Sequence, residues 1–141
     1  MKTLQSRDNL VWIDLEMTGL DPEKEKIIEI ATLVTNSDLH IIAEGPNLVI
    51  SQSNEILESM DEWNLTHHGS SGLIEEVKKS DVTEQIAEIE TLEFISKYVG
   101  EKVSPMCGNT VSHDRRFLSK YMPRLESVSY THLRAHETFA N

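Results

Sequence analysis

The segment LVWIDLEMTGLD, residues 10–21, restricts the fold of this chain more than any other. It is an apolar run interrupted by Asp14 and Glu16, and it ends in a turn. Successive side chains of a strand point to opposite faces, so the two carboxylates share one face and the apolar side chains occupy the other. Carboxylates are costly to bury unless they are paired or bind a metal. The segment therefore predicts either a half-exposed edge strand or part of a site.

The rest of the chain follows an α/β pattern. Apolar, β-branched runs within residues 10–17, 26–36 and 40–51 predict three strands with short connections, as in an antiparallel meander. Gly45-Pro46 predicts a bend or bulge in the third strand. The later segments predict helices within 54–68, 72–80 and 81–100, a short buried strand within 104–110 and a helix within 112–122 that ends before Pro123. A meander followed by this order predicts an α/β fold with a mixed sheet.

The segment 81–100 is the clearest predicted helix. Its start signal is Asp81 with Glu84 three residues on, and its stop signal is Gly100. Apolar residues approximate a stripe with a period of 3.6, which predicts a buried face formed by Ile86, Ile89, Leu92, Phe94, Ile95, Tyr98 and Val99.

Composition restricts the class of protein. The chain has 141 residues, of which 38% are hydrophobic and 26% charged, as in a single globular domain. The formal net charge of −11 argues against tight non-specific binding to a long nucleic acid, but it allows a short anionic ligand that is held through metal ions. The lone Cys107, and an N-terminus without a long apolar segment, predict a reducing, cytoplasmic location.

A third acidic residue extends the pattern of Asp14 and Glu16. Two neighbouring carboxylates at a strand end suit hard divalent cations, which prefer oxygen ligands. Asp114 lies near the start of the helix that follows the short fourth strand. Its other interpretation is helix capping, because the helix dipole favours an acid in the first turn.

Four segments carry a resemblance to a known family. WIDLEMTGLD, IIEIATLVT, MDEWN and CGNTVSHDRRFLSKYMP resemble segments of oligoribonucleases, 3′-to-5′ exoribonucleases of the DEDDh exonuclease superfamily, from about Asn9 to Glu126. The resemblance implies an RNase H-like exonuclease fold, with a mixed sheet flanked by helices. It implies hydrolysis of very short RNA, down to dinucleotides, to mononucleotides by a homodimeric enzyme. The cofactors that it implies are two divalent cations, Mg²⁺ or Mn²⁺.

The resemblance also implies roles for individual residues. Catalytic, metal-binding carboxylates are expected at Asp14, Glu16 and Asp114. Substrate contacts are expected at Leu20, which wedges against a base, Trp63, which stacks on the substrate, His68, which contacts a phosphate, and Thr110, a small hydroxyl residue nearby.

Some of these assignments have alternatives. Trp63 can also be interpreted as a core residue. The choice between His67 and His68 depends on the register after Trp63. His113, which precedes Asp114, is interpreted as a solvated residue at a helix start rather than a catalytic histidine.

The resemblance ends near Ser127. We expect residues 1–127 to form an incomplete exonuclease domain that lacks the last strand and the C-terminal helices, with the general-base histidine and the last aspartate of the family. Residues 128–141, VSYTHLRAHETFAN, resemble one reading frame of a sequencing adapter, so we expect an artefactual tail rather than a replacement site at His132 and Glu137. Activity is then expected to be impaired. The alternatives are a non-catalytic remnant that binds metal or oligonucleotide, and a related DEDDh proofreading-type DNA exonuclease.

Overall fold

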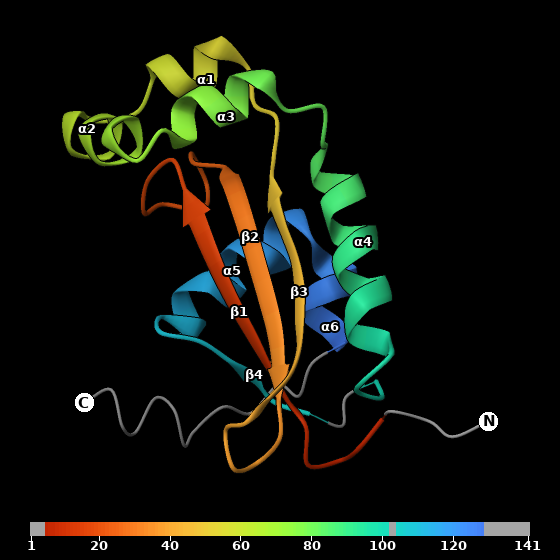
Figure 1. The fold of residues 1–141 in the computed structure, drawn as a ribbon. Helices are drawn as coiled ribbons and strands as arrows, with labels where there is room; N and C mark the ends of the chain where they lie inside the picture. The colour runs from red at the N-terminus through yellow and green to blue at the C-terminus, as the bar shows by residue number, and fades with distance from the viewer. Residues whose placement is uncertain (1–4, 102–103, 129–141) are drawn as a thin grey trace.

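The computed structural model describes residues 5–101 and 104–128, which form a mixed sheet with helices around it (Figure 1). The sheet order is β3-β2-β1-β4. The first three strands are antiparallel neighbours, and β4 is parallel to β1. The strands are β1 (Leu10–Met17), β2 (Ile27–Thr35), β3 (Ile41–Val49) and β4 (Met106–Cys107). The predicted meander and mixed sheet are confirmed.

Six helices surround this sheet in the described part of the chain. They are α1 (Asn54–Glu58), α2 (Glu62–Ser70), α3 (Leu73–Lys79), α4 (Glu84–Ser96), α5 (Val111–Tyr121) and α6 (Pro123–Val128). Figure 1 shows α4, α5 and α6 against one face of the sheet, and α1–α3 at the end where β1 finishes. None of the helices within these described ranges has the length and apolarity needed to cross a membrane.

Two hydrophobic clusters hold these layers together. The larger one, here called the sheet core, joins the inward side chains of β1 and β2 to α4, α5 and α6; it includes Val11, Ile13, Leu15, Ile30, Ile95, Phe117 and Leu118. Helices α1–α3 are here called the helical cap. The smaller cluster lies under them and comprises Ile28, Leu57, Met60, Leu73, Ile74 and Val77. The cap is therefore attached to the sheet through a small apolar contact of its own.

The bulge predicted in β3 is present at Gly45-Pro46. Ala31 pairs with Asn47 and Leu33 with Glu44, so β3 contains one residue more than β2 over this interval. A Cβ atom at Gly45 would collide with the ring of Phe94 on α4. The glycine therefore allows the helix to approach the strand closely.

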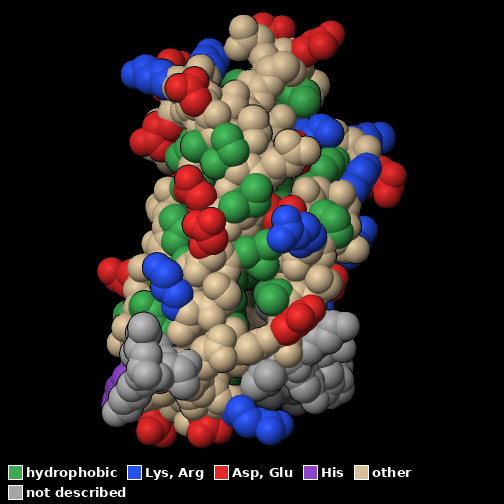
Figure 2. All heavy atoms as spheres, turned by 90° about the vertical axis from the view of Figure 1, so that its right-hand side faces the viewer, with side chains coloured by type: hydrophobic (Ala, Val, Ile, Leu, Met, Phe, Trp, Pro, Cys, Tyr) green, Lys and Arg blue, Asp and Glu red, His purple; other side chains and the backbone are tan. Residues whose placement is uncertain are grey.

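The predicted details of α4 are partly wrong. The helix begins at Glu84, and its N-cap is Thr83, whose side chain accepts a hydrogen bond from the Ile86 amide. The predicted cap at Asp81 is therefore incorrect. Its buried face is formed by Ala87, Glu88, Thr91 and Ile95. By contrast, Ile86 and Ile89 are 42% and 45% exposed, on the side of the molecule where Figure 2 shows hydrophobic side chains among charged ones.

The buried Glu88 explains this rotation of α4. Its Oε2 accepts a hydrogen bond of 3.0 Å from the backbone amide of Leu125, in the first turn of α6. The first amides of a helix lack intrahelical partners, so the carboxylate stabilises the start of α6 and is itself satisfied. The sequence prediction ended the preceding helix correctly before Pro123, but it did not include α6.

Candidate active site and metal centre

The site lies where β1 continues beyond its short neighbour β4. Val11 and Trp12 pair with β4, and among residues 5–101 and 104–128 no strand pairs with the last part of β1 on that side. The chain leaves β4 through Gly108, where an added Cβ would be 2.6 Å from the carbonyl oxygen of Ile13. This close approach brings the start of α5 next to the end of β1.

Asp14 and Glu16 project from the face of β1 opposite to the sheet core. Asp14 is exposed, and the side chain of Glu16 is 39% exposed. In the register with β2 they lie opposite Ala31 and Glu29. In the sheet order β1 lies between β2 and β4, so it is an interior strand, but the part that carries Asp14 and Glu16 extends beyond its pairing with β4.

Asp114 faces β1 from the first turn of α5. It is only 1% exposed, and its Oδ1 accepts a hydrogen bond of 3.3 Å from Thr110 Oγ1. Burial raises the pKa of Asp114 to about 7, and the charges of Asp14 and Glu16 add to this, against hydrogen bonds from Thr110 and the Leu15 backbone. The N-cap residue of α5 is Thr110, and Asp114 lies in the first turn, where the helix dipole favours an acid, as the alternative interpretation expected.

These three carboxylates have the donor chemistry of a divalent-cation site, although among the described residues their oxygens do not all lie within 4.8 Å of one another. The buried Oδ2 of Asp114 has no hydrogen-bond partner among the described residues, which is costly for a polar atom. The neighbouring acids repel it, as the raised pKa of Asp114 shows. A hard cation would ligate the free oxygen and offset the repulsion, and the donors are all oxygen.

A further acid on this face was missed from the sequence. Glu29 pairs with Glu16 across β1 and β2. Burial raises the pKa of Glu29, as do the charges of Glu16, Glu76 and Asp14, while a hydrogen bond with Asn47 lowers it. The alternation in the segment IIEIA, residues 27–31, could have placed Glu29 on the polar face. Only the strand register shows that Glu29 lies opposite Glu16.

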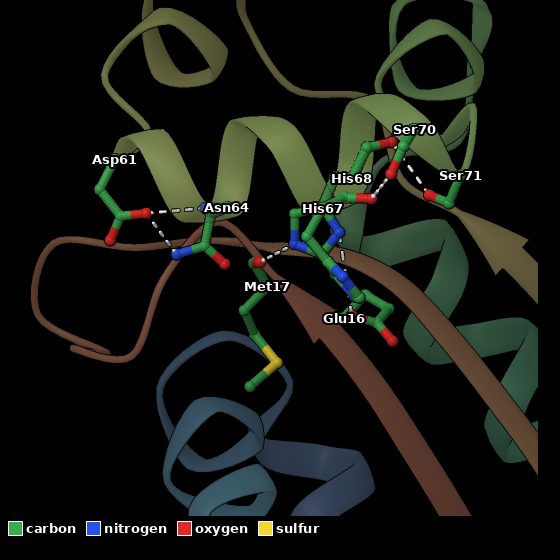
Figure 3. A network of polar contacts seen from close by, with 8 residues as sticks. All are labelled: Glu16, Met17, Asp61, Asn64, His67, His68, Ser70 and Ser71. Carbon is green, nitrogen blue, oxygen red and sulfur yellow. Dashed lines mark hydrogen bonds and ion pairs between the residues drawn. The ribbon is translucent and has the colours of Figure 1, made fainter.

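The helical cap contributes histidines to the end of β1 (Figure 3). His68 on α2 is 2% exposed, and its Nε2 lies 2.9 Å from the carbonyl oxygen of Met17. Its Nδ1 lies 3.9 Å from Glu16 Oε2. His67 is exposed and stacks on Trp63, with ring centroids 4.9 Å apart and planes 11° apart.

The other predicted contact residues are at the surface. Trp63 is 68% exposed, so its interpretation as a core residue is wrong. Leu20 is 77% exposed in the loop after β1, and Thr110 is exposed beside Asp114. The structure thus groups Glu16 with His68 and Asp114 with Thr110, and it leaves Leu20 and Trp63 open to a ligand. A shallow pocket adjoins Asp14 and is lined by Trp12, Ile13, Ala31, Thr32, Leu33, Gly108 and Asn109.

Two histidine interpretations have different outcomes. His113 is half-buried rather than solvated, because its ring packs edge-on against Phe117 at 5.3 Å. Burial and the neighbouring Arg116 lower the pKa of His113. His132 and Glu137 lie outside the described residues.

Comparisons with known proteins agree with this arrangement. A family model described as Exonuclease (RNase T) matches residues 11–139. An oligoribonuclease of Ruthia magnifica is 59% identical over 92% of this chain and 73% of that protein. The oligoribonuclease of Coxiella burnetii is 60% identical over 91% of this chain and 70% of that protein.

Solved structures show the same fold at much lower identity. Escherichia coli exonuclease I in complex with a dT13 oligonucleotide is 15% identical, with a TM-score of 0.65, over 84% of this chain and 24% of that chain. The likeness supports an RNase H-like exonuclease fold. The family match and the close relatives lead to one assignment: this chain belongs to the exonuclease family and, within it, to the oligoribonucleases.

Proposed function

We propose that this chain acts as a metal-dependent 3′-to-5′ exoribonuclease on very short RNA, down to dinucleotides, and releases mononucleotides. The observation that carries the proposal is the buried Asp114, which has an unpartnered oxygen and lies under the influence of Asp14 and Glu16. Curated relatives with the name oligoribonuclease support RNA as the substrate.

Asp14, Glu16 and Asp114 are the residues that would hold two divalent cations, Mg²⁺ or Mn²⁺. When bound, such ions activate the attacking water and stabilise the leaving 3′-oxygen. The chain supplies the positioning: β1 presents two carboxylates on one face, while burial and Thr110 restrict the side chain of Asp114.

The exposed side chains would bind the two ends of a short substrate. Trp63 offers a ring face for base stacking, which accepts any base. Leu20, at the end of the β1 loop, is proposed as the wedge against a base, and Thr110 as a hydroxyl contact. The net charge of −11 favours substrates with few phosphates.

We propose His68 as a phosphate contact, and this role depends on which ring nitrogens carry a proton. Its Nε2 lies at hydrogen-bond distance from the Met17 carbonyl, which can only accept, so the proton of a neutral His68 belongs on Nε2. A hydrogen bond from Nδ1 to a phosphate then requires the doubly protonated ring.

The test is hydrolysis of a labelled RNA dinucleotide by the purified chain with Mn²⁺ or Mg²⁺. We expect turnover that EDTA stops and that Asp14→Asn removes. The control is Asp38→Asn, since Asp38 is an exposed acid in the β2–β3 turn. Metal-dependent binding of the dinucleotide without turnover would overturn the catalytic proposal in favour of a binding remnant. Equal or faster cleavage of the DNA dinucleotide would favour the proofreading-type alternative.

Four associated predictions belong to this proposal: a homodimer, a cytoplasmic location, impaired activity and an unrelated tail at residues 128–141. The homodimer is checked by light scattering on the purified chain. The cytoplasmic location is supported by a single, buried cysteine, Cys107. Impaired activity and the proposed tail at residues 128–141 stay predictions. Impaired activity is measured by comparing the turnover number in the dinucleotide assay with that of a longer relative.

A further inference from the structure

A second group of metal-ligating side chains lies where α2 meets the end of β1. Glu16, His67 and His68 each offer one ligand atom, and these atoms lie within 4.8 Å of one another. Figure 3 shows both imidazole rings descending from α2 toward the Glu16 side chain. The group joins the helical cap to the sheet, and it shares only Glu16 with the carboxylates of the proposed Mg²⁺ or Mn²⁺ centre.

His68 is oriented as metal-ligating histidines are. Its Nε2 lies 2.9 Å from the Met17 carbonyl, so the neutral ring donates from Nε2 and carries its lone pair on Nδ1. That lone pair lies 3.9 Å from Glu16 Oε2, on a side chain that is almost fully buried. Histidine ligands commonly donate the other ring N–H to a backbone carbonyl, which fixes the tautomer and the ring.

The distances need only small adjustments to hold an ion. A tetrahedral ion with bonds of 2.0–2.2 Å places its ligand atoms roughly 3.4 Å apart. The pair of His68 and Glu16 is close to this value at 3.9 Å. His67 has to move by about an ångström to complete such an arrangement, and it is exposed, with Trp63 as its stacking partner.

The donors distinguish this group from the three carboxylates. Two imidazole nitrogens and one carboxylate oxygen suit Zn²⁺ and Co²⁺, whereas an all-oxygen set suits Mg²⁺ and Mn²⁺. Three protein ligands leave the fourth position of a tetrahedral ion to a water or an anion.

We propose that Glu16, His67 and His68 form a zinc-class site that competes with the hard-cation centre for Glu16. An ion held there draws Glu16 toward the helical cap and occupies Nδ1 of His68. Zn²⁺ is then an inhibitor of the Mn²⁺-supported reaction. The inhibition rests on the proposed function, whereas the binding of Zn²⁺ or Co²⁺ does not.

Cobalt(II) is the probe for the site, because tetrahedral Co²⁺ absorbs visible light strongly and Zn²⁺ displaces it. The experiment uses the full chain with His132→Gln and His136→Gln as the background, since these two histidines of residues 129–141 could bind Co²⁺ themselves. On that background we compare His67→Gln with His40→Gln, a matched change of an exposed histidine before β3.

We expect a tetrahedral cobalt spectrum in the background protein and in His40→Gln, with Zn²⁺ displacing the cobalt. His67→Gln should weaken cobalt binding by at least about tenfold through loss of a ligand, and Glu16→Gln should do the same. An unchanged spectrum in His67→Gln, or no tetrahedral spectrum in the background protein, overturns the site. His67 is exposed, so its variant should fold, which circular dichroism verifies.

Activity separates the inference from the proposed function. Micromolar-range Zn²⁺ added to the Mn²⁺ reaction should inhibit the background protein and His40→Gln, and His67→Gln should need at least about tenfold more Zn²⁺ for half inhibition. A cobalt spectrum without any dinucleotide turnover refutes the proposed function and keeps the site. Turnover with Mn²⁺ that Zn²⁺ inhibits equally in all three proteins refutes the site and keeps the function.

Discussion

A buried polar side chain next to the sheet core and one in the helical cap differ in whether their polar atoms have partners. Next to the sheet core, Asp114 is buried near other acids with one oxygen unsatisfied, and its pKa is raised to about 7. In the cap, His68 is equally buried, but its Nε2 lies at hydrogen-bond distance, 2.9 Å, from the Met17 carbonyl. The carboxylate centre therefore carries an energetic cost in the metal-free protein, whereas the cap histidine adds to the contact between the two regions.

The two regions also differ in how firmly they are held. The sheet core connects four strands to three helices, and the cap rests on a cluster of six buried residues. Regions with few buried apolar contacts open more easily than a large core. We infer that the proposed metal centre is on the rigid side of the molecule and that Trp63, His67 and His68 are on the side that can adjust to a substrate.

The largest difference between the regions should appear when an acid is neutralised in each. Asp114→Asn keeps the shape but removes a proposed metal ligand, so dinucleotide turnover should fall by about 10²–10⁴-fold. In the cap, Asp61→Asn should leave turnover within about twofold, because Asn is an equally good N-cap and Asp61 caps α2. Similar losses of turnover in the two variants would show that Asp61 also contributes to the reaction.

The next difference concerns stability against pH. Asp114 has a folded pKa of about 7 against an ordinary 3.8, so the folded state binds the proton more tightly. The free energy of unfolding of the metal-free chain should therefore fall as pH rises from about 4 to 7, by roughly 2–4 kcal/mol from this group, and then level off. Urea unfolding in EDTA at pH 5 and pH 8 measures it.

Asp114→Asn isolates this contribution. The variant lacks the titrating group, so its stability should change less between the two pH values than that of the wild type, and it should be the more stable protein at pH 8. Equal pH dependence in both proteins would mean that Asp114 is not destabilised in the fold.

Replacing a glycine by alanine in each region should change the free energy of unfolding by an intermediate amount. Gly108→Ala would place a Cβ 2.6 Å from the Ile13 carbonyl oxygen, and both groups are backbone-anchored, so we expect a loss of about 1–3 kcal/mol. Gly69→Ala on α2 meets only Ile74 at 3.8 Å, and alanine favours the helix, so a gain of about 0.5–1 kcal/mol is expected. Urea unfolding decides, and a stable Gly108→Ala would show that the β4–α5 junction adjusts freely.

The smallest effect concerns Trp63, whose role should be confined to binding. Because the ring is 68% exposed, Trp63→Ala should change the free energy of unfolding by less than about 0.5 kcal/mol. Loss of base stacking should weaken dinucleotide binding by about 1–2 kcal/mol, measured as KM or by titration. The control is Ile86→Ala, an exposed apolar residue on α4. A marked loss of stability in Trp63→Ala would place the ring in the structure of the cap instead.

Local patterns in the chain were enough to predict the strands and the shared face of Asp14 and Glu16. Alternation places Asp14 and Glu16 on one face of β1, and β1 spans the predicted residues 10–17. The turn chemistry around Gly45-Pro46 predicted the bulge in β3, and the chain order predicted a mixed sheet. These features depend on neighbouring residues, so they can be read before the fold is known.

Tertiary packing decided the remaining features, since they depend on residues far apart in the chain. The stripe predicted for residues 81–100 is right for Leu92, Phe94, Ile95, Tyr98 and Val99, which lie in or against the sheet core. It is wrong for Ile86 and Ile89, because Glu88 turns inward to reach the Leu125 amide. Asp114 comes under the influence of Asp14 and Glu16 because Gly108 lets the start of α5 approach β1. Glu29 faces Glu16 only through the strand register, and His67 and His68 meet Glu16 only because α2 lies over the end of β1. Periodicity shows which side chains share a face, but the partner of that face is set by packing between distant segments.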